Sequence, residues 1–311
     1  MQVAVIGLGE IAKKGYLPVL TAWEGTDLLF MSRSSETVRC LQEQYRVARG
    51  TNNLDDVLRA KPKAAFVLSP SETHFEIAHA LLEGGIDVFL EKPATLHSEQ
   101  THQLAELADR NGRVLMVGFN RRYAPLHQQA REIWGEHTTS IAQFQKYRSN
   151  ASHPSLTHQF TDDTIHQIDT LRYFCGEGEV VSTAHQMHEG RLYGAISTVA
   201  LERGGFAQVV TSLRAGRWQE VYAIHGDQLS VQIEAFSELQ VLEKNNTQVW
   251  KETYASSWKT TLEGRGFAGQ IAHFFDCVRE RTQPMTDGWD SVKTQRLMEA
   301  MVEKAIGTDG L

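Results

Sequence analysis

The pattern of glycines near residue 7 predicts that the chain binds phosphate. Gly7-Leu8-Gly9-Glu10-Ile11-Ala12 follows G-x-G-x-x-A, directly after the apolar run 3–7, which predicts a buried strand. In this pattern the first glycine permits a tight turn, and the second admits the backbone close to a pyrophosphate. The small Ala12 lets helix and strand pack closely, and the start of the helix offers N–H groups to the phosphates. The motif therefore predicts a dinucleotide site.

The residues after the second predicted strand indicate which dinucleotide fits. This strand, 27–32, leads into Ser32-Arg33-Ser34, where an NAD-binding protein usually has Asp or Glu for the ribose 2′-hydroxyl. A guanidinium and hydroxyl groups suit a 2′-phosphate instead. Ser32 and Arg33 therefore favour NADP(H) over NAD(H). The alternative is that Arg33 stacks on adenine or lies in solvent.

Lys92 is a candidate for the reaction itself. Glu91-Lys92-Pro93 follows the apolar run 86–90, and the carboxyl ends of strands in an open α/β sheet line its ligand crevice. A lysine at this position can hydrogen-bond a substrate oxygen and favour its alkoxide-like form as hydride leaves. The alternative is a surface lysine in a strand that ends at proline.

A second group with possible chemistry lies at 162–169, Asp-Asp-Thr-Ile-His-Gln-Ile-Asp. On a helix, Asp162 and His166 share a face, and Asp169 lies on the same side. An imidazole held by carboxylates is a plausible general base for an alcohol proton. Ordinary acidic capping of a helix N-terminus is the alternative. His153, His158, Asp162 and His166 match no defensible metal-ligand spacing, so we predict no metal site.

Alternating strands and helices up to residue 118 must position the first three groups. The predicted strands are 3–7, 27–32, 64–69, 86–90 and 114–118, and the predicted helices begin near 11 or span 36–45, 74–83 and 98–111. Such alternation predicts a doubly wound parallel sheet with right-handed crossovers.

The pattern changes after residue 118. We predict helices at 125–135, 164–174, 269–281 and 291–305, a strand at 141–147, and antiparallel strands between about 180 and 255 with turns at 203–205, 226–227 and 245–246. The fold class is therefore α/β, with an N-terminal Rossmann domain at 1–120 and a C-terminal α+β domain with a mainly antiparallel sheet at 121–311.

Composition excludes several other classes of protein. The chain has 311 residues, 41% of them hydrophobic and 22% charged, which suits two globular cores. A net charge of −7 argues against binding to nucleic acid or to an anionic membrane. The three cysteines form no disulfide or zinc pattern, and we find neither a signal peptide nor a run of 18 apolar residues. We expect a cytoplasmic protein.

Together these motifs resemble the Gfo/Idh/MocA oxidoreductase family over nearly the whole chain. The resemblance rests on GLGEIA at 7–12, LSPSETH at 68–74, EKP at 91–93, VGFNRRYAP at 117–125 and DDTIHQID at 162–169. Within the family, the chain is similar to an MviM-like branch at KYRSN (146–150), DDTIHQIDTLRYFCG (162–176) and RGFAGQIAHFFDCV (265–278). That branch has no secure substrate.

The resemblance implies an NAD(P)-dependent dehydrogenase or reductase that acts on CH–OH groups of a sugar, cyclitol or related polyol. It implies that Lys92 is the catalytic lysine and that His166 is the acid/base, with Asp162 at the family's D-x-x-x-H positions. It also implies an open-faced sheet in the second domain and a homodimer or homotetramer. The further residues that it places near the cofactor are Ser69, Pro70, Thr73, His74, Glu91, Asn120 and Arg121.

Two alternatives stay open. An NAD-dependent glycoside hydrolase that oxidises its sugar transiently has the same fold, and so does a non-catalytic dinucleotide-binding regulator. The chain also departs from the family before D-x-x-x-H, where Gln159-Phe160-Thr161 replaces the usual glycines. This difference can reshape the substrate pocket, so we do not transfer the identity of a sugar.

Overall fold

The computed structural model describes residues 1–151, 153–252 and 258–306, which form two compact units. Unit 1 contains Met1–Asn120 together with Phe267–Lys293, and unit 2 contains Arg121–Gly266 together with the chain from Thr294 onward. The segment Phe267–Lys293 thus returns to the first unit late in the chain. No helix in the described ranges is both long enough and apolar enough to cross a membrane.

Unit 1 is built on a six-stranded parallel sheet with the order β3-β2-β1-β4-β5-β6. The strands are β1 (Gln2–Ile6), β2 (Asp27–Met31), β3 (Arg49–Thr51), β4 (Ala64–Val67), β5 (Asp87–Leu90) and β6 (Leu115–Val117). The strand order reverses between β1 and β4, and open α/β sheets bind ligands at this point. The predicted doubly wound parallel sheet is confirmed.

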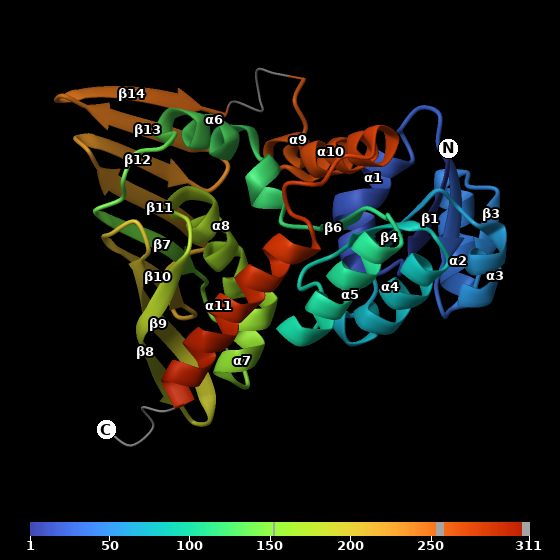
Figure 1. Cartoon of the computed structure of the whole chain (residues 1–311), viewed down its shortest axis with the longest axis horizontal. Helices are drawn as coiled ribbons and strands as arrows, with labels where there is room; N and C mark the ends of the chain where they lie inside the picture. Colours follow the sequence, from blue (N-terminus) through green and yellow to red (C-terminus); the bar gives the residue numbers. More distant parts are fainter. Residues whose placement is uncertain (152, 253–257, 307–311) are drawn as a thin grey trace. The chain divides into compact units, whose positions relative to one another are not determined.

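Helices bury the strands of this sheet. They are the π-helical turn η1 (Ala12–Tyr16) with α1 (Leu17–Leu20), α2 (Ser35–Tyr45), α3 (Leu54–Ala60), the 3-10 turn η2 (Ser71–Thr73), α4 (His74–Glu83), α5 (Ser98–Arg110) and α10 (Phe267–Glu280). Helices α4 and α5 run side by side (Figure 1). Phe274 of α10 packs on the rings of Phe66 in β4 and Phe89 in β5, with centroids 5.2 and 5.6 Å away. These contacts explain why the return segment belongs to unit 1.

Two elements of unit 1, β3 and α3, were not predicted. Strand β3 is the three-residue edge strand Arg-Gly-Thr, which is largely exposed and has no apolar alternation. Gly50 is needed there because a Cβ would lie 2.5 Å from a methyl group of Val38 in α2. Helix α3 spans seven residues with one fully buried side chain, Val57. Neither element has the periodicity that identifies longer ones.

Unit 2 is built on an eight-stranded sheet with the order β14-β13-β12-β11-β7-β10-β9-β8. The strands are β7 (Ile141–Tyr147), β8 (Gly178–His188), β9 (Arg191–Leu201), β10 (Phe206–Ser212), β11 (Gln219–Gly226), β12 (Leu229–Glu234), β13 (Glu238–Glu243) and β14 (Asn246–Lys251). All pairs are antiparallel except β7 with β10. The predicted mainly antiparallel sheet is confirmed. The predicted strand region also reached 253–255, which lies outside the described residues.

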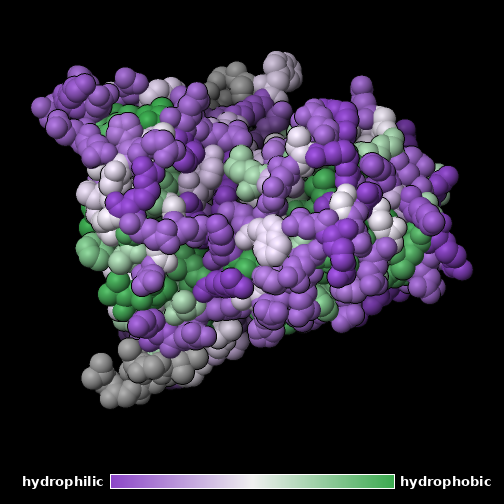
Figure 2. All heavy atoms as spheres, viewed as in Figure 1, coloured by the Kyte–Doolittle hydropathy of each residue, from purple (hydrophilic) through white to green (hydrophobic). Residues whose placement is uncertain are grey.

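One face of this sheet is buried beneath helices. They are η3 (Asn120–Tyr123), α6 (Pro125–Trp134), α7 (Leu156–Gln159), the π-helical turn η4 (Phe160–Thr164), α8 (Ile165–Cys175), α9 (Thr261–Gly264) and α11 (Gly288–Ile306), which begins in unit 1. Phe144 and Tyr222 on the covered face are completely buried, whereas their neighbours Gln143 and Ala223 on the other face are half-buried. On the surface shown in Figure 2, apolar residues lie among polar ones over the sheet of unit 2.

Candidate active site

The glycine motif forms a tight turn between β1 and the helical segment that follows. Gly7 has φ +90°, and a Cβ there would lie 2.4 Å from the backbone nitrogen of Ser69, so only glycine fits. Gly9 faces open space, because a Cβ at this residue would have no heavy atom within 4 Å. Ala12 is completely buried. The turn is therefore packed against the end of β4 on one side and leaves room for a pyrophosphate on the other.

A cavity of about 550 Å³ opens beside this turn, at the carboxyl ends of β1, β2 and β4. Its size suits a small-molecule site. Nine of the predicted cofactor residues line it: Gly7, Gly9, Glu10, Ile11, Ser32, Arg33, Ser69, Pro70 and Thr73. The residues present thus fit a dinucleotide, with the glycine turn available to its phosphates and Ser32 and Arg33 at the end of β2.

The cavity also contains residues that sequence reasoning missed. Lys13 and Thr37 line it together with the apolar side chains of Leu8 and Ile77. Lys13 directly follows the glycine motif in the sequence, and this position could have identified it as a cavity residue. Glu10, the carboxylate in the lining, lies 2.8 Å from Lys14, which offsets its charge. Lys13 and Arg33 therefore give the cavity a positive character.

His74 was predicted near the cofactor but does not line this cavity. Its ring is buried between two carbonyl oxygens, with Nε2 2.8 Å from the oxygen of Ser69 and Nδ1 2.9 Å from that of Pro93. Burial lowers the pKa of His74, although the carbonyl oxygens of Pro93 and Ser69 oppose this effect. The ring connects the turn after β4 to the turn that contains Lys92.

Lys92 lies two residues after β5, which pairs with β4 in the same parallel sheet. The Lys92–Pro93 peptide bond is cis. The preceding residue, Glu91, is 7% exposed, and its Oε1 accepts a 2.7 Å hydrogen bond from the hydroxyl of Tyr16. Lys92 and the glycine turn therefore share the carboxyl edge of one sheet.

The predicted cofactor residues Asn120 and Arg121 lie where the chain passes from unit 1 to unit 2. Asn120 is the last residue of the first segment of unit 1, and it is 5% exposed. Arg121 belongs to unit 2, where its Nε and Nη2 donate to the two carboxylate oxygens of Glu220 at 2.7 and 2.8 Å. Neither residue lines the cavity beside the glycine turn.

Asp162 and His166 lie at the junction of η4 and α8 in unit 2. Asp162 is exposed in the π-helical turn, and His166 is 8% exposed at the second position of α8. The α-helical spacing used to pair them therefore does not describe this junction. Asp169 accepts hydrogen bonds from Arg122, with Nη2 2.6 Å from Oδ1. Its carboxylate thus anchors α8 to the segment that precedes α6.

A neighbouring side chain fixes the depth of α8 on the sheet. The buried amide of Gln167 donates to the carbonyl oxygens of Phe144 and Val210, at 2.7 and 3.0 Å. These carbonyls belong to β7 and β10, the parallel pair. His166 therefore projects from a helix that is hydrogen-bonded directly to the sheet.

A buried cluster of charges lies beside this junction. Lys146 Nζ is 2.7 Å from Asp163 Oδ1 and 3.5 Å from Glu220 Oε2. Arg148 donates from Nε and Nη2 to both oxygens of Asp163, at 2.7 and 2.6 Å. With Arg121 on Glu220, three cations accompany two carboxylates. We call these five residues the charge cluster.

Burial and charge oppose each other in this cluster. Burial disfavours ionisation of Glu220, but Arg121 and Lys146 outweigh it and hold the pKa of that carboxyl well below its usual range. Burial likewise acts against ionisation of Asp163, and Arg148 and Lys146 hold its pKa low. Burial lowers the pKa of Lys146, although Glu220 opposes this effect. The hydrogen bonds to Asp163 raise the pKa of Arg148, and the charge of Asp162 adds to this effect.

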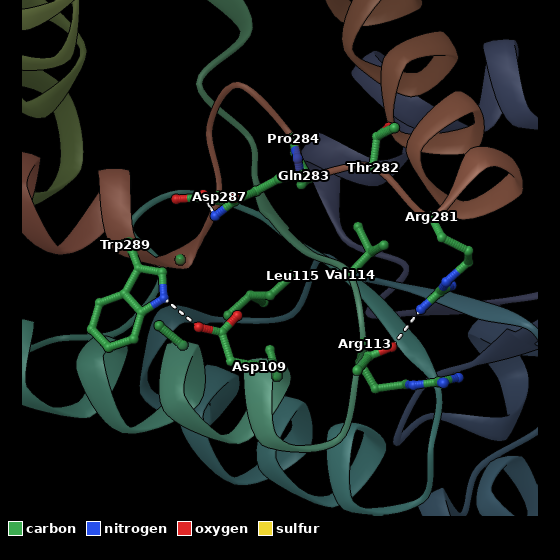
Figure 3. A pocket seen from close by; sticks show the side chains of 14 residues that line it. Asp109, Arg113, Val114, Leu115, Arg281, Thr282, Gln283, Pro284, Asp287 and Trp289 are labelled. Atoms are coloured by element: carbon green, nitrogen blue, oxygen red, sulfur yellow. Dashed lines mark hydrogen bonds between the residues drawn. The ribbon is translucent and has the colours of Figure 1, made fainter.

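A separate cavity of about 280 Å³ lies in unit 1, between the end of α5 and the segment joining α10 to α11 (Figure 3). Its polar side chains are engaged with one another or with the backbone. Trp289 Nε1 donates to Asp109 at 2.8 Å, Arg281 donates to the carbonyl oxygen of Gly112 and to Asp87, and Gln283 donates to Asp287. We assign no ligand to it. Within the described residues, no group of three or more His, Cys, Asp and Glu is arranged to hold a metal ion.

Two family profiles match the chain. The profile described as "Oxidoreductase family, NAD-binding Rossmann fold" matches residues 1–119, and the one described as "Oxidoreductase family, C-terminal alpha/beta domain" matches residues 112–308. The chain belongs to the Gfo/Idh/MocA family of NAD(P)-binding oxidoreductases.

Individual relatives span nearly the whole chain. YceM of Salmonella typhimurium is 30% identical over 98% of both chains. The scyllo-inositol 2-dehydrogenase (NAD(+)) of Bacillus subtilis is 22% identical over 93% of this chain and 89% of its own. The crystal structure of a dehydrogenase, MviM, from Clostridium difficile is 25% identical, with a TM-score of 0.89 over 97% of this chain and 99% of that one. The likeness to MviM was expected from the sequence.

Proposed function

We propose that this chain reversibly oxidises a secondary alcohol of a sugar, cyclitol or related polyol by hydride transfer to a nicotinamide dinucleotide. The observation that carries the proposal is the shared sheet edge of unit 1. The cavity with the glycine turn lies at the carboxyl ends of β1, β2 and β4, and Lys92 follows the adjacent strand β5. A phosphate-binding turn and an amine on one edge suit a dinucleotide and its alcohol substrate. The inositol dehydrogenase among the relatives supports this class of substrate.

Each residue has a defined part in the proposed reaction. In the proposed scheme His166 takes the hydroxyl proton, and Lys92 stabilises the developing oxyanion. Asp162 orients the substrate or tunes His166. The residues that line the cavity beside the glycine turn would hold the dinucleotide, which when bound would supply the hydride acceptor, so that alcohol and oxidised cofactor would become carbonyl, reduced cofactor and one proton.

A screen of polyols and their ketones, followed by absorbance at 340 nm, tests this proposal. Wild-type protein should turn over at least one of them, and Lys92→Ala and His166→Ala should each lower turnover by about 100-fold or more. Turnover that is unchanged in both variants would exclude these roles. The variant Trp289→Phe, at the separate cavity, is the control for a substitution in unit 1 away from Lys92.

We also propose that the cofactor is NADP(H) rather than NAD(H). The cavity combines Lys13 and Arg33 with the hydroxyls of Ser32 and Thr37, and its carboxylate, Glu10, pairs with Lys14. This set of groups suits a 2′-phosphate, because a dianion gains from two cations that the ribose hydroxyl of NAD does not need.

Calorimetric titration with both cofactors tests this preference. NADP should bind at least about tenfold more tightly than NAD, a difference of about 1.4 kcal/mol. Arg33→Ala should remove most of that difference while leaving the affinity for NAD unchanged. Arg39→Ala removes a cation from α2 that does not line the cavity and should preserve the difference. Tighter binding of NAD by the wild-type protein would refute the preference.

We further propose a cytosolic homodimer or homotetramer. The three cysteines are unpaired thiols, which suits a reducing compartment. On the sheet face of unit 2 that its helices leave open, Ile141 and Phe206 are paired neighbours and are 48% and 52% exposed. Exposed apolar side chains on a sheet face favour association. Light scattering after size exclusion should give a multiple of the 35.0 kDa chain mass, and a monomer would refute the proposal.

A further inference from the structure

Tyr16 occupies a central place in unit 1 that the proposed reaction does not yet use. It is the last residue of the π-helical turn η1, which follows the glycine motif. Single π-helical turns are rare and occur often at functional sites. The ring is completely buried and contacts Phe89 and Phe267, with both centroids 5.5 Å away.

The hydroxyl of Tyr16 connects two distant segments of the chain. It donates to Oε1 of Glu91 at 2.7 Å and accepts a hydrogen bond from Nε2 of Gln270 at 3.0 Å. Gln270 lies in α10 and is completely buried, and Glu91 is 7% exposed. One hydrogen-bonded series thus runs from α10, through the turn after the glycine motif, to the residue before Lys92.

Burial removes the Tyr16 hydroxyl and the Glu91 carboxylate from water, so each needs a hydrogen-bond partner within the protein. A buried carboxylate is costly unless it accepts hydrogen bonds, and a bond to a charged acceptor is stronger than one between neutral groups. Burial, followed by the nearby charge of Glu91, raises the pKa of Tyr16 well above its ordinary value, so its hydroxyl stays protonated and donates. The orientation of the Glu91 carboxylate therefore depends on the phenol.

The surrounding backbone leaves space for this side chain. A Cβ on Gly118 would lie 3.0 Å from the Tyr16 hydroxyl, and one on Gly15 would lie 2.8 Å from the ring of Phe267. Gly118 follows β6, and its N–H donates to the carbonyl oxygen of Leu90, immediately before Glu91. The end of β5 is therefore fixed through its backbone by Gly118 and through the Glu91 side chain by Tyr16.

We propose that Tyr16, supported by Gln270, is a positioning residue that holds Glu91 and thereby sets the placement of the Lys92 amine. The inference rests on the proposed function in that Lys92 acts on the substrate oxygen. Tyr16 itself touches no reacting atom in this scheme. Through its hydrogen bonds to Gln270 and Glu91, Tyr16 fixes the end of β5 relative to α10 and to the glycine turn.

The test removes the hydroxyl and keeps the ring. Tyr16→Phe should lower kcat about tenfold, since small displacements of a catalytic group are costly, and should leave KM nearly unchanged. The calorimetric Kd for NADP should also stay the same, because the cavity lining does not include Tyr16. In a Lys92→Ala background, Tyr16→Phe should have no further effect on kcat. Trp289→Phe, which removes a hydrogen bond to a carboxylate elsewhere in unit 1, should leave kcat unchanged.

A second readout does not require turnover. Competitive acetylation followed by mass spectrometry compares the reactivity of Lys92 with that of Lys63 in the same molecule. Tyr16→Phe should raise the relative labelling of Lys92 several-fold, because the turn opens more readily. If wild-type protein oxidises no polyol but Tyr16→Phe changes this labelling, the positioning role of Tyr16 is supported and the proposed function is refuted. The positioning role of Tyr16 is wrong if labelling and kcat both match wild type. It is also wrong if the effects of Tyr16→Phe and Lys92→Ala on kcat multiply independently.

Discussion

The two units bury carboxylates in different ways. In unit 1, Glu91 accepts a hydrogen bond from the uncharged phenol of Tyr16. In unit 2, Glu220 is completely buried and accepts from the phenol of Tyr222 and, with both of its oxygens, from Arg121, and it lies 3.5 Å from Lys146. Both carboxylates thus accept from a phenol, and the one in unit 2 is also paired with the cations of the charge cluster.

The difference follows from what each carboxylate must do. The charge cluster connects β7 and β11 to the π-helical turn that contains Asp162, so its main task is to join elements. Strong pairing serves that task, because a buried ion that loses its partner is very costly. Glu91 precedes a proposed catalytic lysine, and the phenol of Tyr16 orients its carboxylate. We therefore expect Glu220 to contribute mainly to stability in unit 2 and Glu91 to contribute mainly to the position of Lys92 in unit 1.

The largest effect should come from breaking the charge cluster. Glu220→Gln preserves the shape of the side chain but removes the carboxylate charge beside Arg121 and leaves Lys146 with Asp163. The free energy of unfolding should fall by about 3–5 kcal/mol, as for other buried ion pairs that lose one partner. Urea denaturation followed by circular dichroism measures this change. A loss below about 1 kcal/mol would show that the cluster is not needed for stability.

Acid should act on the same cluster. The pKa values of Glu220 and Asp163 are depressed in the folded protein, so the stability they contribute is complete above their unfolded pKa values of about 4. That stability is lost as the pH falls below about 4, and one such group contributes on the order of 2–3 kcal/mol. Unfolding measured between pH 7 and pH 2 should show this decline, and the slope should be smaller in Glu220→Gln. Equal slopes in both proteins would contradict the assignment.

Removal of the neutral donor in unit 1 should have a smaller effect on stability. Tyr16→Phe retains the ring packing and loses two hydrogen bonds, the one accepted from Gln270 and the one to the charged Glu91, which is worth about 1.5–3 kcal/mol. The same urea titration applies. A loss equal to that of Glu220→Gln would remove the distinction between the two units.

The smallest effect should come from an exposed ion pair of the same chemical type. Glu234 lies 3.2 Å from Arg217, and their side chains are 46% and 72% exposed. Because water and salt screen such pairs, Glu234→Gln should change the free energy of unfolding by less than about 0.5 kcal/mol. A larger loss would mean that burial does not determine the order of these effects.

Much of the fold could be predicted because its signals are local. Apolar runs such as 3–7 and 86–90 gave the buried parallel strands, and β3 escaped because three exposed residues have no periodicity. The parallel neighbours β7 and β10 could not be found, since 58 residues separate Tyr147 from Phe206 and strand order leaves no local pattern. The π-helical turns could not be found either, because they break the regular spacing that helix prediction uses.

Part of the candidate site could likewise be predicted from local sequence, and part could not. The glycine motif and the residues after strands predicted most of the cavity lining, because the carboxyl ends of parallel strands meet at one edge. The hydrogen bonds of Tyr16 span 75 residues to Glu91 and 254 residues to Gln270. Contacts at such separation depend on tertiary packing, and a single sequence does not reveal them. The roles of Lys92, Asp162 and His166 stay predictions until variants are measured.

Transfer of deuterium to the cofactor tests the central claim most directly. Polyols and glycosides are prepared with deuterium on the carbon of a secondary alcohol and incubated with the protein and NADP, and the cofactor is then analysed by mass spectrometry. The account predicts reduced cofactor that carries one deuterium, at a rate that falls by about 100-fold or more in Lys92→Ala. Unlabelled cofactor, with glycoside cleavage or with no reaction, would contradict it and favour a hydrolase or a non-catalytic regulator.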